Sequence, residues 1–183
     1  MNNFQKPKAQ VLEFDDLETF EHTKCKPLSV TLAVEFKTRR ILGLEVSSMP
    51  PKGPLVHKAR KYGPRSDERS LGRRNLFQNI QPLLADKVEL KSDSNPHYPP
   101  DVQYFFPESE HLRFLGKRGS LGGQGELKKV RFDPLFSLNH TCAKLRADVN
   151  RLIRKTWCTT KDYRCLRKHL ILYADYHNRN LVA

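Results

Sequence analysis

The chain has 183 residues, of which 33 are Lys or Arg and 20 are Asp or Glu, for a formal net charge of +13. This length suits one domain with a real core, and a hydrophobic fraction of 38% excludes a wholly disordered chain. The absence of an apolar run of membrane-spanning length excludes a transmembrane protein. The polar first ten residues exclude a secretory signal, so we expect a cytoplasmic protein.

The elements follow in chain order. Residues 1–10 are expected to form a disordered leader, and the first half of the remainder contains four segments typical of strands, at 11–16, 28–36, 41–48 and 87–93. The first three are expected to form an antiparallel meander. Residues 49–65 predict a loop, because they hold four prolines and two glycines. Ser66 is a candidate cap for a helix running to about Ala85.

In the second half, VQYFF at 102–106 predicts a short strand, and 116–125 predicts a glycine-rich loop without the ending of a phosphate-binding loop. Two helices are expected, over 134–157 and 161–178. The first has one stripe of residues at helical spacing, formed by Leu138, Cys142, Leu145, Val149, Leu152 and Thr156. Mixed strands and helices indicate an α/β fold.

The cysteines do not form a zinc site by spacing. None of the four belongs to a C-x-x-C pair, and Cys158 and Cys165 are too far apart for a zinc knuckle. We therefore expect reduced thiols, as in other cytosolic proteins.

The charge is concentrated in three basic segments. Residues 52–74 hold eight bases and two acids, 113–131 hold six and one, and 144–168 hold nine and two. In contrast, residues 13–21 hold five acids and no base. Basic residues neutralise nucleic-acid phosphates, and clustered carboxylates collect divalent cations. The pattern favours a metal-dependent enzyme acting on nucleic acid, although any single basic segment could be a solvated helix face.

Two aspartates end predicted strands. Asp15 ends the first strand and Asp93 ends the strand at 87–93. If these strands are neighbours, both carboxylates lie at one edge of the sheet and can hold a divalent metal for phosphoryl transfer. Two structural alternatives stay open: Asp93 in S-D-S-N-P also suits an Asx turn, and Asp15 could belong to a solvated acidic segment.

Four segments resemble InsB-like transposases of bacterial insertion elements, namely E-F-D-D at 13–16, L-K-S-D-S-N-P-H-Y at 90–98, L-N-H-T-C-A-K-L-R-A-D-V-N-R-L-I-R-K-T at 138–156 and Y-A-D-Y-H-N at 173–178. The resemblance implies a ribonuclease-H-like mixed sheet flanked by helices over residues 11–180. It also implies a DDE-type enzyme that cuts DNA and transfers the strand during transposition, located at the bacterial nucleoid. Two alternatives are a structure-selective nuclease of the same fold and a catalytically decayed, basic DNA-binding remnant.

The resemblance places the three catalytic, metal-binding positions at Asp15, Asp93 and Asn139, with Mg²⁺ or Mn²⁺ as cofactor. The third position departs from the family, which usually has a glutamate there. An amide oxygen can bind a metal but brings no charge, so either the chain is a working variant or the copy is decayed.

The expected DNA contacts are basic residues, and Arg146 and Arg154 share the helical flank of Asn139. The full set is Arg73, Arg74, Arg146, Arg151, Arg154 and Lys155. The expected partners are double-stranded DNA, at the element ends and the target, and further copies of the chain, with no membrane. The family's zinc-ribbon DNA-binding segment has no counterpart before Asp15, and we expect it to be lost or supplied by an upstream protein or reading frame.

Overall fold

A computed structural model of the chain describes residues 7–115, 133–152 and 158–182. Its centre is a five-stranded sheet with the order β3-β2-β1-β4-β5. The strands are β1 (Ala9–Phe20), β2 (Pro27–Glu35), β3 (Ile41–Ser48), β4 (Leu84–Asp93) and β5 (His111–Phe114). The antiparallel meander of the first three strands is confirmed, and β1 begins two residues inside the segment expected to be a leader.

The sheet is mixed, and β1 lies at the change of direction. It pairs antiparallel with β2 on one side and parallel with β4 on the other, and β4 pairs parallel with β5. The expectation that the first strand lies beside the strand at 87–93 is therefore confirmed. Because side chains alternate between faces, β1 supplies Leu12 and Phe14 to one face and Leu17 to the other.

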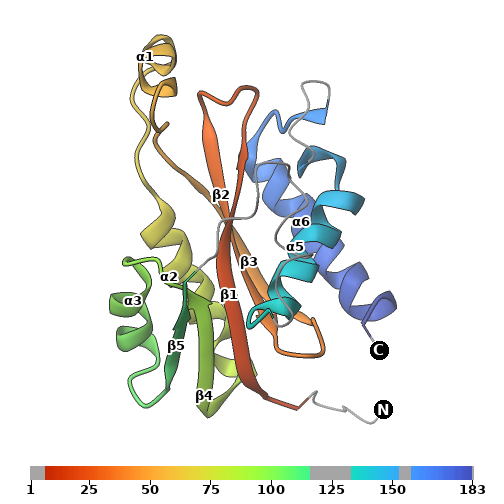
Figure 1. Cartoon of the computed structure of the whole chain (residues 1–183). Coiled ribbons are helices and arrows are strands. Elements are labelled where there is room, and N and C mark those ends of the chain that lie inside the picture. Colours follow the sequence, from red (N-terminus) through yellow and green to blue (C-terminus); the bar gives the residue numbers. More distant parts are fainter. Residues whose placement is uncertain (1–6, 116–132, 153–157, 183) are drawn as a thin grey trace.

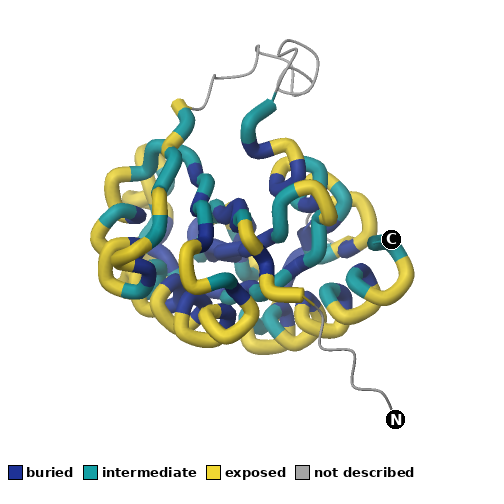
Figure 2. The backbone as a smooth tube through the Cα atoms, turned by 90° about the horizontal axis from the view of Figure 1, so that it is seen from below, coloured by how far each residue is buried: buried dark blue, intermediate teal, exposed yellow. Residues whose placement is uncertain are grey.

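Helices cover both faces of this sheet, so the fold is α/β (Figure 1). The helices of the described residues are α1 (Leu55–Ala59), α2 (Arg69–Ile80), α3 (Tyr98–Phe105), α5 (Phe136–Asp148) and α6 (Tyr163–Asn180), with short 3₁₀ turns η1 (Arg60–Tyr62), η2 (Gln81–Leu83) and η3 (Asn150–Leu152). The α2 and α3 helices share one buried apolar cluster with the sheet, and α5 and α6 share the other. Figure 2 shows the buried backbone in the middle of the molecule and the exposed backbone around it.

Three predicted elements need correction. The segment at 102–106 is part of the helix α3 and is not a strand, because Pro99 and Pro100 occupy its first turn, where a missing N–H costs nothing. The 49–65 segment contains α1 and η1. The helix expected from Ser66 to Ala85 is shorter, since α2 begins at Arg69 and the chain is extended again at Leu84.

Two further differences concern the second half of the chain. The strand β5 was not predicted, and it has only four residues. The α5 helix ends at Asp148, earlier than predicted, because Val149 has an extended backbone conformation. No helix in the described part of the chain is both long and apolar enough to cross a membrane.

Candidate acidic site

Asp15 and Asp93 lie side by side on adjacent parallel strands. The last pair of the parallel register is Glu13 of β1 with Lys91 of β4, and Asp15 and Asp93 each follow two residues later in these neighbouring strands. The Asp93 carboxylate also raises the pKa of Asp15, so the two acidic groups interact electrostatically. The predicted juxtaposition of these two aspartates is therefore present in the fold.

Asp15 is held in a partly buried position that favours its protonated form. Burial is the main cause that raises its pKa to about 7, and the nearby charge of Asp93 adds to it. Two hydrogen bonds act in the opposite direction: the Tyr98 hydroxyl donates to Oδ1 at 2.9 Å, and the Asp16 N–H donates to the same oxygen at 2.7 Å. Within the described residues these are the hydrogen bonds printed for the Asp15 carboxylate, and both are made to Oδ1.

Asp93 is the last residue of β4 and begins a turn. Its Oδ1 accepts a hydrogen bond from the Asn95 N–H at 2.9 Å, which is the Asx-turn geometry that the sequence left open. This turn fixes the Asp93 side chain at the carboxyl end of the strand while one oxygen still has capacity for another contact. The Asx turn and a role in binding are thus compatible.

Tyr98 belongs to the same cluster, although it was not singled out from the sequence. Its side chain is fully buried, and the neighbouring carboxylates of Asp16, Asp15 and Asp93 raise its pKa after the larger effect of burial. Asp16 points to the opposite face of β1 from Asp15 and accepts a hydrogen bond from the Thr31 hydroxyl at 2.5 Å. The Tyr98 hydroxyl thus donates a hydrogen bond to Asp15 and orients the carboxylate of that residue.

On α5, the predicted third position, Asn139, has no hydrogen bond to Asp15 or Asp93 within the described residues. Asn139 is exposed, and its amide donates to Asp133 Oδ2 at 2.9 Å. The α5 side chain that lies close to Asp15 is Cys142, whose pKa is raised to about 12 by burial and by the Asp15 charge. The sequence pattern had placed Cys142 only in the apolar stripe.

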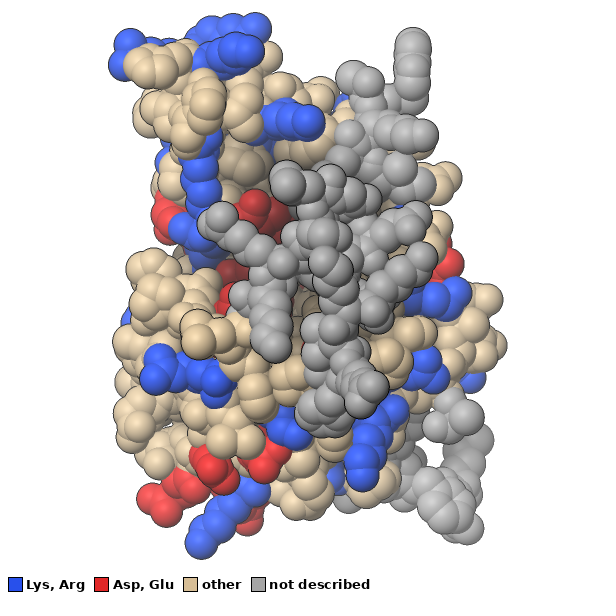
Figure 3. Space-filling model, viewed as in Figure 1, with Lys and Arg blue, Asp and Glu red and all other residues tan. Residues whose placement is uncertain are grey.

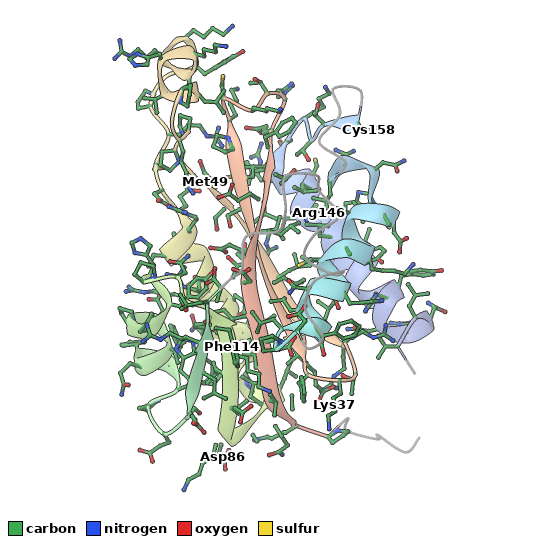
Figure 4. The ribbon with its side chains drawn as sticks, viewed as in Figure 1. Lys37, Met49, Asp86, Phe114, Arg146 and Cys158 are labelled. Atoms are coloured by element: carbon green, nitrogen blue, oxygen red, sulfur yellow. The ribbon has the colours of Figure 1, made fainter. Side chains whose placement is uncertain are left out.

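The predicted DNA contacts fall into three groups. Arg73 is a correction: it is 2% exposed, and its guanidinium bonds to Asp101, so it cannot meet a phosphate at the surface. Arg74 and Arg146 are exposed, although Arg74 pairs with Asp101 at 2.8 Å. Arg146 lies close enough to Cys142 to lower its pKa, on the side of α5 nearer β1 (Figure 4).

The remaining three predicted contacts follow α5 in the sequence. Arg151 belongs to the 3₁₀ turn η3 and is half-exposed. Arg154 and Lys155 lie outside the described residues.

Glu13 is a buried carboxyl that the sequence reading did not single out. Its Oε2 accepts a hydrogen bond from the Leu138 N–H at 2.7 Å, which ties β1 to the first turn of α5. Its pKa is raised to about 7, mainly by burial and also by the charge of Asp133, while the backbone donors and Lys91 act in the opposite direction. Its Oε1 is buried without a hydrogen-bond partner among the described residues.

The C-terminal motif at 173–178 has structural contacts in this fold. The Tyr173 hydroxyl donates to Asp148 at 2.6 Å, and His177 lies 3.0 Å from the Arg39 carbonyl oxygen. The Asn178 side chain accepts from the N–H and donates to the carbonyl of Ile41, both at 2.8 Å. These contacts fasten α6 to α5 and to the edge strand β3.

Acidic side chains are visible on the face of the molecule drawn in Figure 3. Figure 3 shows acidic side chains in a recess near the middle of this face, next to basic side chains. In the described parts of the chain, no three His, Cys, Asp or Glu side chains are grouped so that they could hold a metal ion. A metal site in these parts of the chain would thus have Asp15 and Asp93 as its acidic ligands.

No family model and no curated protein matches this chain.

Proposed function

We propose that the chain catalyses metal-dependent phosphoryl transfer on DNA, as the transposase resemblance implies, with Asp15 and Asp93 as the carboxylates that hold the cation. The observation that carries this proposal is their position on adjacent parallel strands, where Asp93 raises the pKa of Asp15. Two like charges in a partly buried position repel each other, and a bound cation would offset that repulsion.

The two residues fit Mg²⁺ or Mn²⁺ by their chemistry. Mg²⁺ prefers oxygen ligands and is usually held by one or two carboxylates, while waters and substrate phosphates complete its shell. Two aspartates without a third acidic side chain therefore meet the requirement. When bound, such a cation activates the attacking oxygen and stabilises the leaving oxygen in phosphoryl transfer.

The residues around the pair would position its ligands. The Tyr98 hydroxyl and the Asp16 N–H hold Oδ1 of Asp15, which orients Oδ2 toward the ligand. The Asn95 N–H similarly fixes Asp93. Arg146, which lies near Cys142 on α5, would contact a phosphate of the bound strand.

The architecture supports the same proposal. The five-stranded mixed sheet, flanked by helices on both faces, is compatible with the ribonuclease-H-like fold that the resemblance implies. A fold alone hosts many functions, so the argument depends on the acidic pair.

Asn139 is retained as the proposed third ligand, with a condition. Its amide must release Asp133 before its oxygen can turn to the cation. Cys142 is a poor substitute, because a thiol with a pKa of about 12 is protonated at neutral pH and thiolates suit softer metals.

The experiment is nicking of supercoiled plasmid DNA with Mg²⁺ or Mn²⁺. Wild type should nick, and Asp93→Ala should abolish nicking. Asp86→Ala is the matched control, because Asp86 lies in the same strand with a side chain that is 98% exposed. An Asp93→Cys variant should recover activity with Mn²⁺ rather than Mg²⁺, since a thiolate prefers the softer cation. Nicking that survives Asp93→Ala would refute this site.

Further variants separate the alternatives. If Asn139 is a working ligand, Asn139→Ala abolishes nicking. If the copy is decayed, wild type is inactive and Asn139→Glu creates metal-dependent nicking. Products in which a donor end is joined to the plasmid identify a transposase, and nicking without joined products identifies a nuclease.

A further inference from the structure

A basic arm projects from one end of the sheet. It comprises residues 50–65, with α1 and η1 at its tip, and it holds five Lys or Arg residues and no acid. It leaves the sheet after Met49, which is 1% exposed and labelled in Figure 4. Figure 1 shows α1 standing beyond the layers of sheet and helices, near the turn between β1 and β2.

The base and the tip of the arm differ in how their charges are used. At the base, Lys52 pairs with Glu18 at 3.0 Å and Arg65 pairs with Glu21 at 3.4 Å. At the tip, Lys58, Arg60 and Lys61 are exposed, and none has an acidic partner among the described residues. The two ion pairs at the base of the arm thus fasten it to β1 and to the residue that follows this strand. The tip presents positive charge that is not paired with an acid of the described residues.

The arm has a defined conformation around a hollow. Ala59 is 5% exposed, and the Tyr62 ring lies under two ammonium groups, those of Lys26 at 5.3 Å and Lys61 at 5.0 Å from its centroid. The hollow between the arm and the β1–β2 turn has a volume of about 530 Å³ and is lined by Thr23, Cys25, His57, Lys58, Arg60, Lys61 and Tyr62. Three of these side chains belong to Lys or Arg, and no acid of the described residues lines the hollow.

The arm is also continuous with the acidic recess. Figure 3 shows basic side chains from the α1 end of the molecule down to the recess. Arg65 pairs with Glu21 just after β1, and the pKa of Arg69 is raised mainly by its hydrogen bond to Asp67 and further by the charges of Asp16 and Glu18 on β1. A polyanion that ends at the aspartates and runs along this face would thus reach the arm.

We propose that the tip of this arm binds the phosphate backbone of duplex DNA outside the catalytic pair. This inference rests on the proposed function, because the commitment to DNA over other polyanions comes from it. Three cations without acidic partners, spaced over four residues, suit phosphates, and phosphate contacts position a duplex without reading its sequence.

The test is the binding of a fluorescent duplex oligonucleotide by the full chain, without divalent metal, over a series of salt concentrations. The arm variant is Lys58→Ala with Lys61→Ala. The matched control is Lys87→Ala with Lys168→Ala, which removes two exposed lysines that also lack an acidic partner among the described residues. Circular dichroism of both variants verifies that they are folded.

The arm variant should bind about ten- to a hundredfold more weakly near 0.1 M salt, and its log–log salt slope should fall by about 1.8, since each lost phosphate contact removes about 0.9. The control should bind as wild type does. Equal losses in both variants, or no loss in the arm variant, would overturn the inference. Tighter binding of an RNA duplex of the same length would show that DNA is the wrong partner.

One more variant separates this inference from the proposed function. Asp93→Ala should abolish nicking but keep the binding affinity and the difference between arm and control. If nicking requires Asp93 while the arm variant binds normally, the arm proposal fails alone. If the arm binds duplex DNA and no variant nicks, the catalytic proposal fails alone.

Discussion

Asp15 titrates near neutral pH because two opposing influences act on one carboxyl group. Burial and the charge of Asp93 raise its pKa to about 7, and the Tyr98 hydrogen bond lowers it. Asp93→Asn should therefore lower the pKa of Asp15, because it removes a like charge. Tyr98→Phe should raise it, because the hydroxyl stabilises the charged form. Carbon-13 NMR titration of the carboxyl groups in metal-free protein measures both shifts, and two shifts of the same sign would contradict this account.

Asp101 forms salt bridges with the buried Arg73 and the exposed Arg74. It and Arg73 each have side chains 3% exposed, whereas the Arg74 side chain is 58% exposed. Asp101→Ala should lower the free energy of unfolding by about 3–5 kcal/mol, since it leaves Arg73 buried without a counter-charge. Arg74→Ala should leave the urea midpoint close to that of wild type, because water replaces an exposed partner. Equal effects of the two substitutions would show that Arg73 escapes to solvent.

At the scale of elements, Glu13 joins β1 to α5 and makes that junction sensitive to pH. Its pKa of about 7 in the folded protein exceeds the ordinary value of 4.5, so the folded state binds more protons between these two values. The contribution of Glu13 to stability is therefore fully present below pH 4.5 and is lost as pH rises to about 7.

Glu13→Gln should abolish this dependence. Between pH 5 and pH 8 the wild type should lose up to about 3 kcal/mol of unfolding free energy relative to the variant, as measured by urea denaturation at the two pH values. Glu108→Gln is the control, because Glu108 is exposed and its substitution should leave the pH dependence parallel to that of wild type. A parallel curve for Glu13→Gln would show that Glu13 stays charged.

The elements that could be predicted from the sequence are those whose hydrophobic pattern is long. The ends of β2 and β3 lie within one residue of the ends predicted for them. Both strands are rich in β-branched and apolar residues, and a clear turn separates them. VQYFF gave a false strand, since most of it belongs to a helix that begins near two prolines and buries Val102, while Tyr104 is exposed. β5 escaped prediction because four residues carry too little pattern.

The candidate site was predictable only in part. Asp15 and Asp93 could be paired from the sequence because each falls at or near the end of a strand pattern. The predicted end of the first strand was wrong, since β1 continues to Phe20 and Asp15 lies inside it, whereas Asp93 does end β4. The parallel register, and not a shared strand end, therefore brings the two residues near each other. Tyr98 could not be added, since its contact with Asp15 depends on the path of the turn after β4. The burial of Arg73 was also hidden, because it depends on Asp101 in a helix that was not predicted.

At the scale of the molecule, stability should be uneven. β1 lies between two strands and contributes to both apolar clusters, whereas the arm at 50–65 has few buried residues. Hydrogen exchange followed by mass spectrometry should show the slowest exchange in β1 and β2 and much faster exchange in the arm. Duplex DNA should then slow exchange in the arm. Strong protection of the arm without DNA would contradict this picture.

The parallel pairing of β1 with β4 also has a consequence for biosynthesis. The segments that form β2, β3 and α2 lie between β1 and β4 in the chain, so they are synthesised before β4 can pair with β1. Asp15 and Asp93 therefore meet only when most of the sheet has been made. Such non-local pairing is slow to form. A nascent chain halted after β3 carries Asp15 on β1, but it lacks Asp93 and the strand β4 that brings Asp93 near it. If the pair does hold a cation, its metal affinity appears only in one late step of folding, and a prematurely terminated product would lack that affinity.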